Sequence, residues 1–403
     1  MQAQEAPPVL TPIEALARHH QALHLFAPDG ETPLVLPGII GTVFFERGSK
    51  PDVRAGILKC FDRFGELFGQ HLKGGKAEDL AKFSKKNAAG VASIRRAITE
   101  TPPDGELSVL WSSATNQDAA AEYQISTLTF GELPFDYKPP GSNYIAPKGT
   151  DGGALSYLKF KLPMHFISND EGLAIYEELL RFVCEALPVR GGYGGLSPNL
   201  PFSYHRYMPI EHELAKRFSG LEIDSRAFAQ SDEYVATSYE GESPTKKTAF
   251  YPYLKPGAKV RAWGYIKSVN WYTLLGDVFV NRLGGEDKLR RDLQRSDIRI
   301  ERIGQCVLIR AGEFPRLGAP EEGLPEPYVF VNSVLRVLRS PSPDSLHLHI
   351  PDLDHAGLDE TKRWEGRFDL PGAPPIPRTP EYVPHPAPPS AGDLLMANAG
   401  EIC

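Results

Sequence analysis

The sequence has no apolar run long enough to cross a membrane. A membrane-spanning helix needs roughly 20 consecutive apolar residues, and the longest apolar segments are interrupted by charged residues or by Pro37 and Pro163. The amino-terminal residues MQAQEAPPVLTPIEALARHH contain no basic segment followed by an apolar core, so no secretory signal is visible. These features favour a cytoplasmic protein that does not span a membrane.

Cysteine is scarce. The 403 residues include four cysteines, Cys60, Cys184, Cys306 and Cys403. They are far apart, they form no Cys-x-x-Cys pair, and three of them lie within apolar patterns. We therefore expect reduced thiols that are buried in the core.

Motifs of common catalytic and nucleotide-binding sites are missing. No GxSxG occurs and no cysteine stands in a family signature with histidine, so covalent catalysis has no local support. The glycine-rich segment before Ala77 lacks the hydroxyl residue of a phosphate loop. Ser197 replaces the third glycine of a dinucleotide fingerprint, so we interpret RGGYGGLSPN as a tight turn. No cofactor is expected.

Basic residues are outnumbered. The chain has 44 lysines and arginines and 51 acidic residues, which gives a formal charge of −7. This balance argues against a general nucleic-acid binder that neutralises phosphates, while a basic protein partner stays open. At 41% hydrophobic residues the chain can bury a large core.

The segment VRAWGYIKSVNWYTLLGDVFVNRLGG, residues 260 to 285, changes hydrophobic period midway. Alternation from Val260 to Ile266 predicts a strand. From Asn270 onward the apolar residues recur three and four apart, which predicts a helix with Asn270 as its N-cap. Paired glycines would end that helix in left-handed conformation. The residues of this structural motif are Trp263, Asn270, Trp271, Leu275, Gly284 and Gly285, and its large side chains are expected in the core.

The rest of the chain predicts an α+β fold with a mostly antiparallel sheet and packed helices. Thr11 should cap a first helix with Glu14. A strand and an amphipathic helix between residues 34 and 72 are followed by the same order at 155 to 187, which suggests two related strand-helix units. Between them we expect a helix near residues 91 to 98 and two paired strands. A helix at 210 to 218, a hairpin near 297 to 312 and two final helices complete the fold.

We divide the chain into a helical lead-in at 1–30, one α+β domain at 31–369 and a proline-rich tail at 370–403. The tail has too few apolar side chains to fold alone and should be extended or disordered.

Two groups of histidines have features of a metal site. His20 and His24 have the i, i+4 spacing of a metal pair, but no third ligand lies nearby in the sequence, so a solvated histidine face is the simpler interpretation. A second cluster contains His347, His349, Asp352, Asp354 and His355. It would serve a metal-dependent hydrolase using His347, His349 and Asp352, although a polar strand end before an Asp-rich turn explains it without metal. We expect no metal.

Acidic residues dominate between positions 211 and 242. The segment carries Glu211, Glu213, Glu222, Asp224, Asp232, Glu233, Glu240 and Glu242 against three basic residues, a balance of 3 − 8 = −5. These residues are our candidate partner-binding patch. The alternative is a solvated connector without a partner.

The chain resembles the type VI secretion immunity proteins, including those paired with VRR-type nuclease effectors. The resemblance rests on IKSVNWYTLLGDVFVNRLGG, GTVFFERGSKPDVRAGILKCFDRFGELFG, LPVRGGYGGLSPNLP and ETKRWEGRFD, and it spans roughly residues 34 to 369. It implies a non-catalytic inhibitor that binds a cognate toxic effector and covers its active or substrate-binding surface. For a nuclease, an acidic patch would take the place of phosphates. A third class, an adaptor that docks through the proline-rich tail, is also open.

Overall fold

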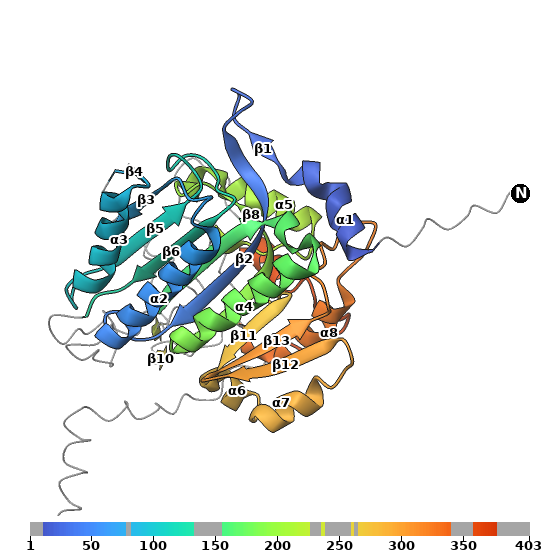
Figure 1. The fold of residues 1–403 in the computed structure, drawn as a ribbon. Helices are drawn as coiled ribbons and strands as arrows, with labels where there is room; N and C mark the ends of the chain where they lie inside the picture. Colours follow the sequence, from blue (N-terminus) through green and yellow to red (C-terminus); the bar gives the residue numbers. More distant parts are fainter. Residues whose placement is uncertain are drawn as a thin grey trace, which may run out of the picture.

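A computed structural model describes residues 11–77, 82–132, 155–225, 235–237, 259–261, 265–339 and 358–376. An antiparallel sheet of eleven strands runs through this part of the chain (Figure 1), in the order β12-β13-β11-β8-β2-β7-β6-β5-β3-β4, with β1 on the outer part of β2. The strands are β1 (Leu25–Phe26), β2 (Pro33–Phe45), β3 (Gly74–Ala77), β4 (Ser84–Lys85), β5 (Leu107–Ser112), β6 (Gln124–Thr129), β7 (Ser156–Pro163), β8 (Val189–Asn199), β11 (Tyr272–Gly276), β12 (Ile298–Ile303) and β13 (Cys306–Ala311).

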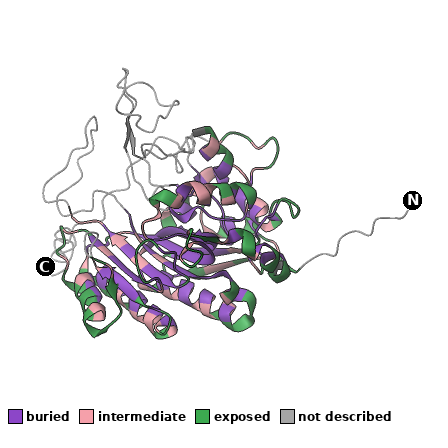
Figure 2. Cartoon of the chain, turned by 90° about the horizontal axis from the view of Figure 1, so that it is seen from above, coloured by how far each residue is buried: buried purple, intermediate pink, exposed green. Residues whose placement is uncertain are grey.

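Three amphipathic helices cover one face of this sheet, namely α2 (Pro51–Phe68), α3 (Ala88–Glu100) and α4 (Asp170–Ala186) (Figure 1). In α2 the apolar side chains recur on the face that packs on the strands, for example Ile57, Phe61 and Phe64. Asn169 caps α4 by accepting a hydrogen bond from the Gly172 amide. Figure 2 shows the buried strands as a purple layer packed against helices. The α+β prediction is confirmed.

The two predicted strand-helix units, β2–α2 and β7–α4, have the expected order. Their strands are direct neighbours, because β2 pairs antiparallel with β7 on one side and with β8 on the other. Thr42 therefore lies opposite Lys159 on β7 and opposite Tyr193 on β8. These three side chains belong to one face of the sheet.

The remaining helices are α1 (Pro12–His19), α5 (Met208–Arg217), α6 (Asp277–Arg282), α7 (Glu286–Asp292), α8 (Glu326–Leu335) and α9 (Leu358–Glu365). Helix α1 begins with the predicted capping box between Thr11 and Glu14. Residues of α1, α5 and α9 share a second hydrophobic cluster that includes Leu16, Phe218 and Trp364. The predicted hairpin is present as β12–β13. No helix within the described ranges is long and apolar enough to span a membrane.

The glycine-rich segment predicted as a tight turn is instead strand β8, and all eleven of its residues are buried. It lies between β2 and β11 near the middle of the sheet. Its glycines leave room for side chains from elsewhere: a Cβ on Gly194 would meet the Tyr176 hydroxyl at 2.3 Å, and one on Gly195 would meet the Asn270 side chain. The turn prediction was wrong because the glycines provide space rather than a change of direction.

The helix predicted from Asn270 was also wrong over its first part. Residues Tyr272–Gly276 form strand β11, and the helix α6 begins only at Asp277. Because β11 pairs with β8 and β13 on its two sides and is wholly buried, it lacks the polar alternation that would have marked it as a strand. Gly284 and Gly285 follow α6 with φ of 92° and 94°, which is the predicted left-handed stop.

The strand predicted from Val260 to Ile266 is described only in part, because residues 262–264 lie outside the described ranges. Strand β10 covers Lys259–Arg261 and pairs with β9 (Val235–Thr237), away from the main sheet. Trp263 lies outside the described residues, and Ile266 forms an isolated bridge with Arg339. Of the tail, residues 377–403 lie outside the described part of the chain.

Candidate functional site

Strand β7 places two lysines on the face of the sheet that is opposite α2 and α4. Its residues alternate, so that Leu158 and Phe160 enter the main core while Lys159 and Lys161 extend to the other side. Both lysines are buried or nearly so, and a buried ammonium group needs a compensating acceptor. The acceptors of Lys159 come from the loop after α5, whereas Lys161 donates to the Leu200 carbonyl at 3.4 Å.

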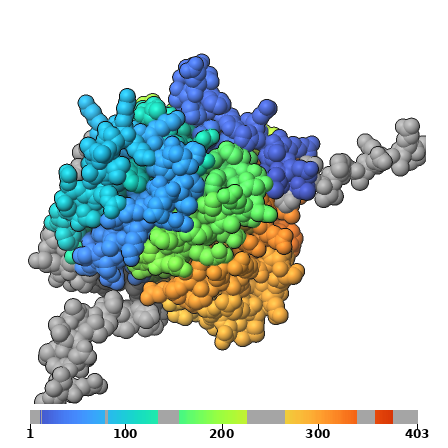
Figure 3. Space-filling view, viewed as in Figure 1, coloured from blue at the N-terminus to red at the C-terminus, as the bar shows by residue number. Residues whose placement is uncertain are grey.

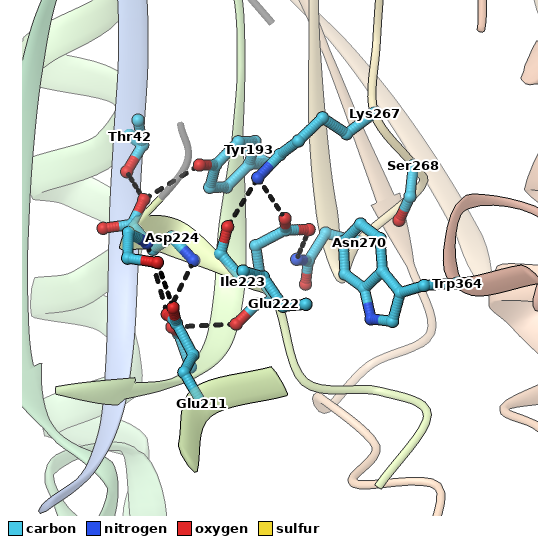
Figure 4. Close-up of polar contacts among 12 residues, drawn as sticks. Thr42, Tyr193, Glu211, Glu222, Ile223, Asp224, Lys267, Ser268, Asn270 and Trp364 are labelled. Atoms are coloured by element: carbon cyan, nitrogen blue, oxygen red, sulfur yellow. Dashed lines mark hydrogen bonds and ion pairs between the residues drawn. The ribbon is translucent and has the colours of Figure 1, made fainter. Parts of the chain in front are cut away.

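Asp224 is the centre of this polar network (Figure 4). One carboxylate oxygen, Oδ1, accepts hydrogen bonds from the Thr42 hydroxyl and the Tyr193 hydroxyl, both at 2.8 Å. The Lys159 ammonium lies 3.3 Å from the second oxygen and donates to the Asp224 backbone carbonyl at 2.8 Å. The three partners are the residues that the strand register places side by side on β2, β7 and β8. The sheet therefore presents a prepared cradle for one carboxylate.

A second buried pair lies beside it. The Lys267 ammonium is 2.9 Å from the Glu222 carboxylate and also donates to the Ile223 carbonyl. Asn270 donates from Nδ2 to the other Glu222 oxygen at 3.1 Å, while its own Oδ1 accepts from the Trp271 amide. Asn270 is thus not the helix cap that the sequence predicted. It connects the loop before β11 to the network (Figure 4).

Glu211 on α5 holds the end of the loop. Its carboxylate accepts from the backbone amides of Asp224 at 3.0 Å and Ser225 at 3.2 Å, and from the Ser225 hydroxyl. Burial raises the pKa of Glu211 to about 7. The short segment 222–225, which contains Glu222 and Asp224, is thereby held beside three lysines and several neutral donors.

The charges in the network shift one another's pKa values. Burial alone would raise the pKa of Asp224, but the Lys159 and Lys161 ammonium groups outweigh burial and lower that pKa to about 2. Burial lowers the pKa of Lys161 to about 8, although Asp224 opposes the shift. At neutral pH Asp224 is therefore ionised and paired, as expected for a structural ion network.

The structure corrects the predicted acidic surface. Glu211, Glu222 and Asp224 are buried and have internal partners: Lys267 pairs with Glu222, Lys159 pairs with Asp224, and Glu211 accepts from the backbone amides of Asp224 and Ser225. Glu213 is exposed and pairs with Lys216 on the same helix. Asp232, Glu233, Glu240 and Glu242 lie outside the described residues. A linear count of charges does not reveal which acids reach the surface.

A shallow depression of about 60 Å³ opens beside the network. Its lining includes Lys161, Glu211, Asp224, Phe202 and Tyr204. Pockets for small-molecule ligands usually measure roughly 300–1,000 Å³, so this depression has room for a few waters or one small polar group. It does not have the size of a substrate pocket.

The other predicted site residues are separate from this network. His24 donates from Nδ1 to the His20 carbonyl oxygen at 2.7 Å, and the two rings lie 4.3 Å apart. His347, His349, Asp352, Asp354 and His355 lie outside the described residues, and no group of three metal-type ligands occurs within the described ranges. Cys60, Cys184 and Cys306 are buried free thiols, as predicted, while Cys403 is outside the described chain.

Sequence reasoning missed the lysines and the hydroxyl donors of the network. One signal was available: Lys159 and Lys161 alternate with apolar residues in a strand whose second face is covered, which is unusual for lysine. Trp271 and Leu275 from the predicted motif are buried in the main core, as expected.

Comparison with solved structures places the fold beside a known protein. The Pseudomonas aeruginosa T6SS protein PA0821 superposes with a TM-score of 0.66 at 23% sequence identity, over 88% of this chain and 90% of that one. At this identity the likeness establishes the fold alone. A search of curated proteins found no match.

A family model identifies the chain more directly. The model described as type VI immunity for VRR-NUC matches residues 56–239 and 257–368, which together make up most of the sequence. The two matched segments include the lysines of β7, the loop 222–225 and the motif around Trp271. The family is one of immunity proteins rather than catalysts, and this chain belongs to it as a type VI immunity protein that acts against an effector.

Proposed function

We propose that the protein neutralises a nuclease effector in the cytoplasm by covering its nucleic-acid-binding surface. The observation that carries this proposal is the family match, whose description specifies VRR-NUC as the target class. Nucleic acid lies in the cytoplasm, so an inhibitor of a nuclease must act there. A nuclease needs cationic groups that bind phosphates, and a partner with a formal charge of −7 complements such a surface.

The buried network supports this function indirectly. It holds the segment 222–225 against β2, β7 and β8 through internal hydrogen bonds and ion pairs. A binding surface that is rigid before association loses less conformational entropy when the complex forms. The network acids themselves do not imitate phosphates, because their oxygens already accept internal bonds. Exposed groups therefore make the contacts with the effector.

Co-expression with the effector encoded beside this gene tests the proposal. We expect the wild-type protein to restore growth, to form a stoichiometric complex with a catalytically inactive effector, and to block nucleic-acid cleavage in proportion to its concentration. A variant effector without nuclease activity should be harmless alone and still bind. Absence of both binding and protection for every adjacent effector would overturn the proposal.

A second measurement separates inhibition of the enzyme from competition for its substrate. The purified protein alone should not retard DNA or RNA in a gel at physiological salt, because it lacks the charge balance for phosphate binding. If it instead protects nucleic acid by coating it, inhibition would depend on the concentration of nucleic acid and not on that of the effector, contrary to the proposal.

A further inference from the structure

The hairpin formed by β1 and the first residues of β2 projects beyond the body of the protein. Figures 1 and 3 show it as the dark blue projection at the top of the molecule. Among the described residues, strand β1 pairs with β2 alone, through Leu25 opposite Val35 and Phe26 opposite Pro33. We define residues 24–33 as the hairpin tip.

Two large apolar side chains of the hairpin tip are exposed. Leu25 is 36% exposed and Phe26 is 45% exposed. The pairing register shifts between these two residues, and the Phe26 ring stacks on His24, so each side chain is covered only in part by the described residues. Large apolar side chains in the described ranges are otherwise mostly buried, so this exposure has a cost in water that a partner would remove.

The tip is also rigid. The Asp29 carboxylate accepts from the amides of Glu31 and Thr32, both at 2.9 Å, and from the Thr32 hydroxyl at 2.7 Å. The Gly30 amide donates to the Ala27 carbonyl, and the Ala27 amide donates to the Thr32 carbonyl. Gly30 has φ of 73°, which a glycine adopts without strain. These bonds fix the turn before any partner arrives.

The charge of the tip is negative. Asp29 and Glu31 are exposed, and residues 24–33 include no lysine or arginine. An aromatic side chain next to carboxylates combines an anchor for a hydrophobic pocket with groups that attract cations. The matching partner is a concave surface lined by lysines or arginines, with an apolar patch inside.

We infer that the hairpin tip inserts Phe26 and Leu25 into the basic nucleic-acid groove of the effector while Glu31 faces its phosphate-binding cations. This inference rests on the proposed function, because it takes the effector to be a nuclease. The hairpin precedes residue 56, where the family match begins, so it lies outside the matched residues. The hairpin tip is thus the element that selects the cognate effector.

Truncation of the apolar anchors tests the inference. We expect Phe26→Ala combined with Leu25→Ala to weaken binding to a catalytically inactive effector by at least about 30-fold, the range of an interface hot spot. Because both side chains are exposed, the midpoint of thermal unfolding should be unchanged. Leu370→Ala is the matched control: Leu370 is 53% exposed and follows α9, so its truncation should change Kd less than threefold.

Removal of the Glu31 charge tests the electrostatic part of the inference. Glu31→Gln should lower the association rate and reduce its dependence on salt, since Glu31 contributes attraction without holding the turn through its side chain. Glu213→Gln on α5 is the control for an exposed acid elsewhere, and it should leave the association rate unchanged.

The outcomes distinguish a failure of the inference from a failure of the proposed function. If the wild-type protein binds the effector and the Phe26/Leu25 variant binds within threefold of it, the inference is overturned while the proposed function stands. A loss of association rate in Glu213→Gln but not in Glu31→Gln would also overturn it, in favour of the acidic segment after α5. If the wild-type protein binds no effector, the proposed function fails and the inference fails with it.

Discussion

Lys267 and Glu222 form an ion pair of 2.9 Å in which the two side chains are 2% and 0% exposed. The two residues are 45 positions apart in the chain. Glu222 lies in the loop after α5, and Lys267 lies in the segment before β11. A pair this deeply buried is stable only while both partners and their hydrogen bonds are present. It links two parts of the chain that no local sequence pattern joins.

Lys267→Met should be strongly destabilising, because it leaves the Glu222 carboxylate charged, buried and without its cation. We expect the free energy of unfolding to fall by about 3–5 kcal/mol, measured by urea denaturation. Lys216→Met removes an exposed ion pair with Glu213 and should cost about 1 kcal/mol or less. The double variant Lys267→Met/Glu222→Gln should recover at least about 1 kcal/mol. Additive losses in the double variant would mean that the two side chains are not coupled.

Glu211 should make stability fall as the pH rises. Its pKa is raised by burial to about 7 in the folded protein, while an unfolded glutamate titrates near 4.3. Between these values the folded state holds more protons than the unfolded state, so the free energy of unfolding decreases with pH, by at most about 1.4 kcal/mol per pH unit. Glu211→Gln should remove this decrease, whereas Glu213→Gln should not. Parallel pH profiles for the wild type and Glu211→Gln would contradict the prediction.

Asp224 should contribute in the opposite direction. Burial is outweighed by the Lys159 and Lys161 ammonium groups, and its folded pKa is about 2, below the roughly 3.9 of an unfolded aspartate. Its contribution is therefore present above about pH 4 and is lost as the pH falls toward 2. Asp224→Asn should have a flatter loss of stability in this acidic window, as measured by the urea midpoint at each pH. An acid profile identical to that of the wild type would show that Asp224 does not titrate with unfolding.

The sequence predicted those elements whose hydrophobic pattern is visible within one short segment. Helices α2 and α4 carry a clear amphipathic period, and the hairpin β12–β13 has two short apolar runs around a turn. Strands β8 and β11 were missed because both are paired on each side and buried on each face, which removes the alternation that identifies a strand. The candidate site was missed because its contacts are not local: Asp224, in the loop after α5, meets Lys159 of β7 across 65 positions of the chain.

Gly194→Ala tests why β8 is rich in glycine. A Cβ at this position would lie 2.3 Å from the Tyr176 hydroxyl, which donates to the Ile40 carbonyl at 2.8 Å. We expect a loss of about 1–3 kcal/mol in the free energy of unfolding, typical of overpacking. Tyr176→Phe removes the oxygen that clashes, so the double variant should lose less than the sum of the single losses. Strict additivity would place the strain elsewhere than at this contact.

Trp271→Ala distinguishes a folding role from an interface role for the motif at residues 260 to 285. The Trp271 ring is fully buried, stacks on Tyr176 with centroids 5.5 Å apart, and donates from Nε1 to the Gly312 carbonyl at 3.2 Å. Truncation should therefore cost roughly 3–5 kcal/mol of stability, seen as a lower urea midpoint. At a temperature where the variant stays folded, its affinity for the effector should remain within threefold of the wild type, because no part of the ring reaches the surface. A Trp271→Ala protein of wild-type stability that had lost effector binding would instead place this motif at the interface.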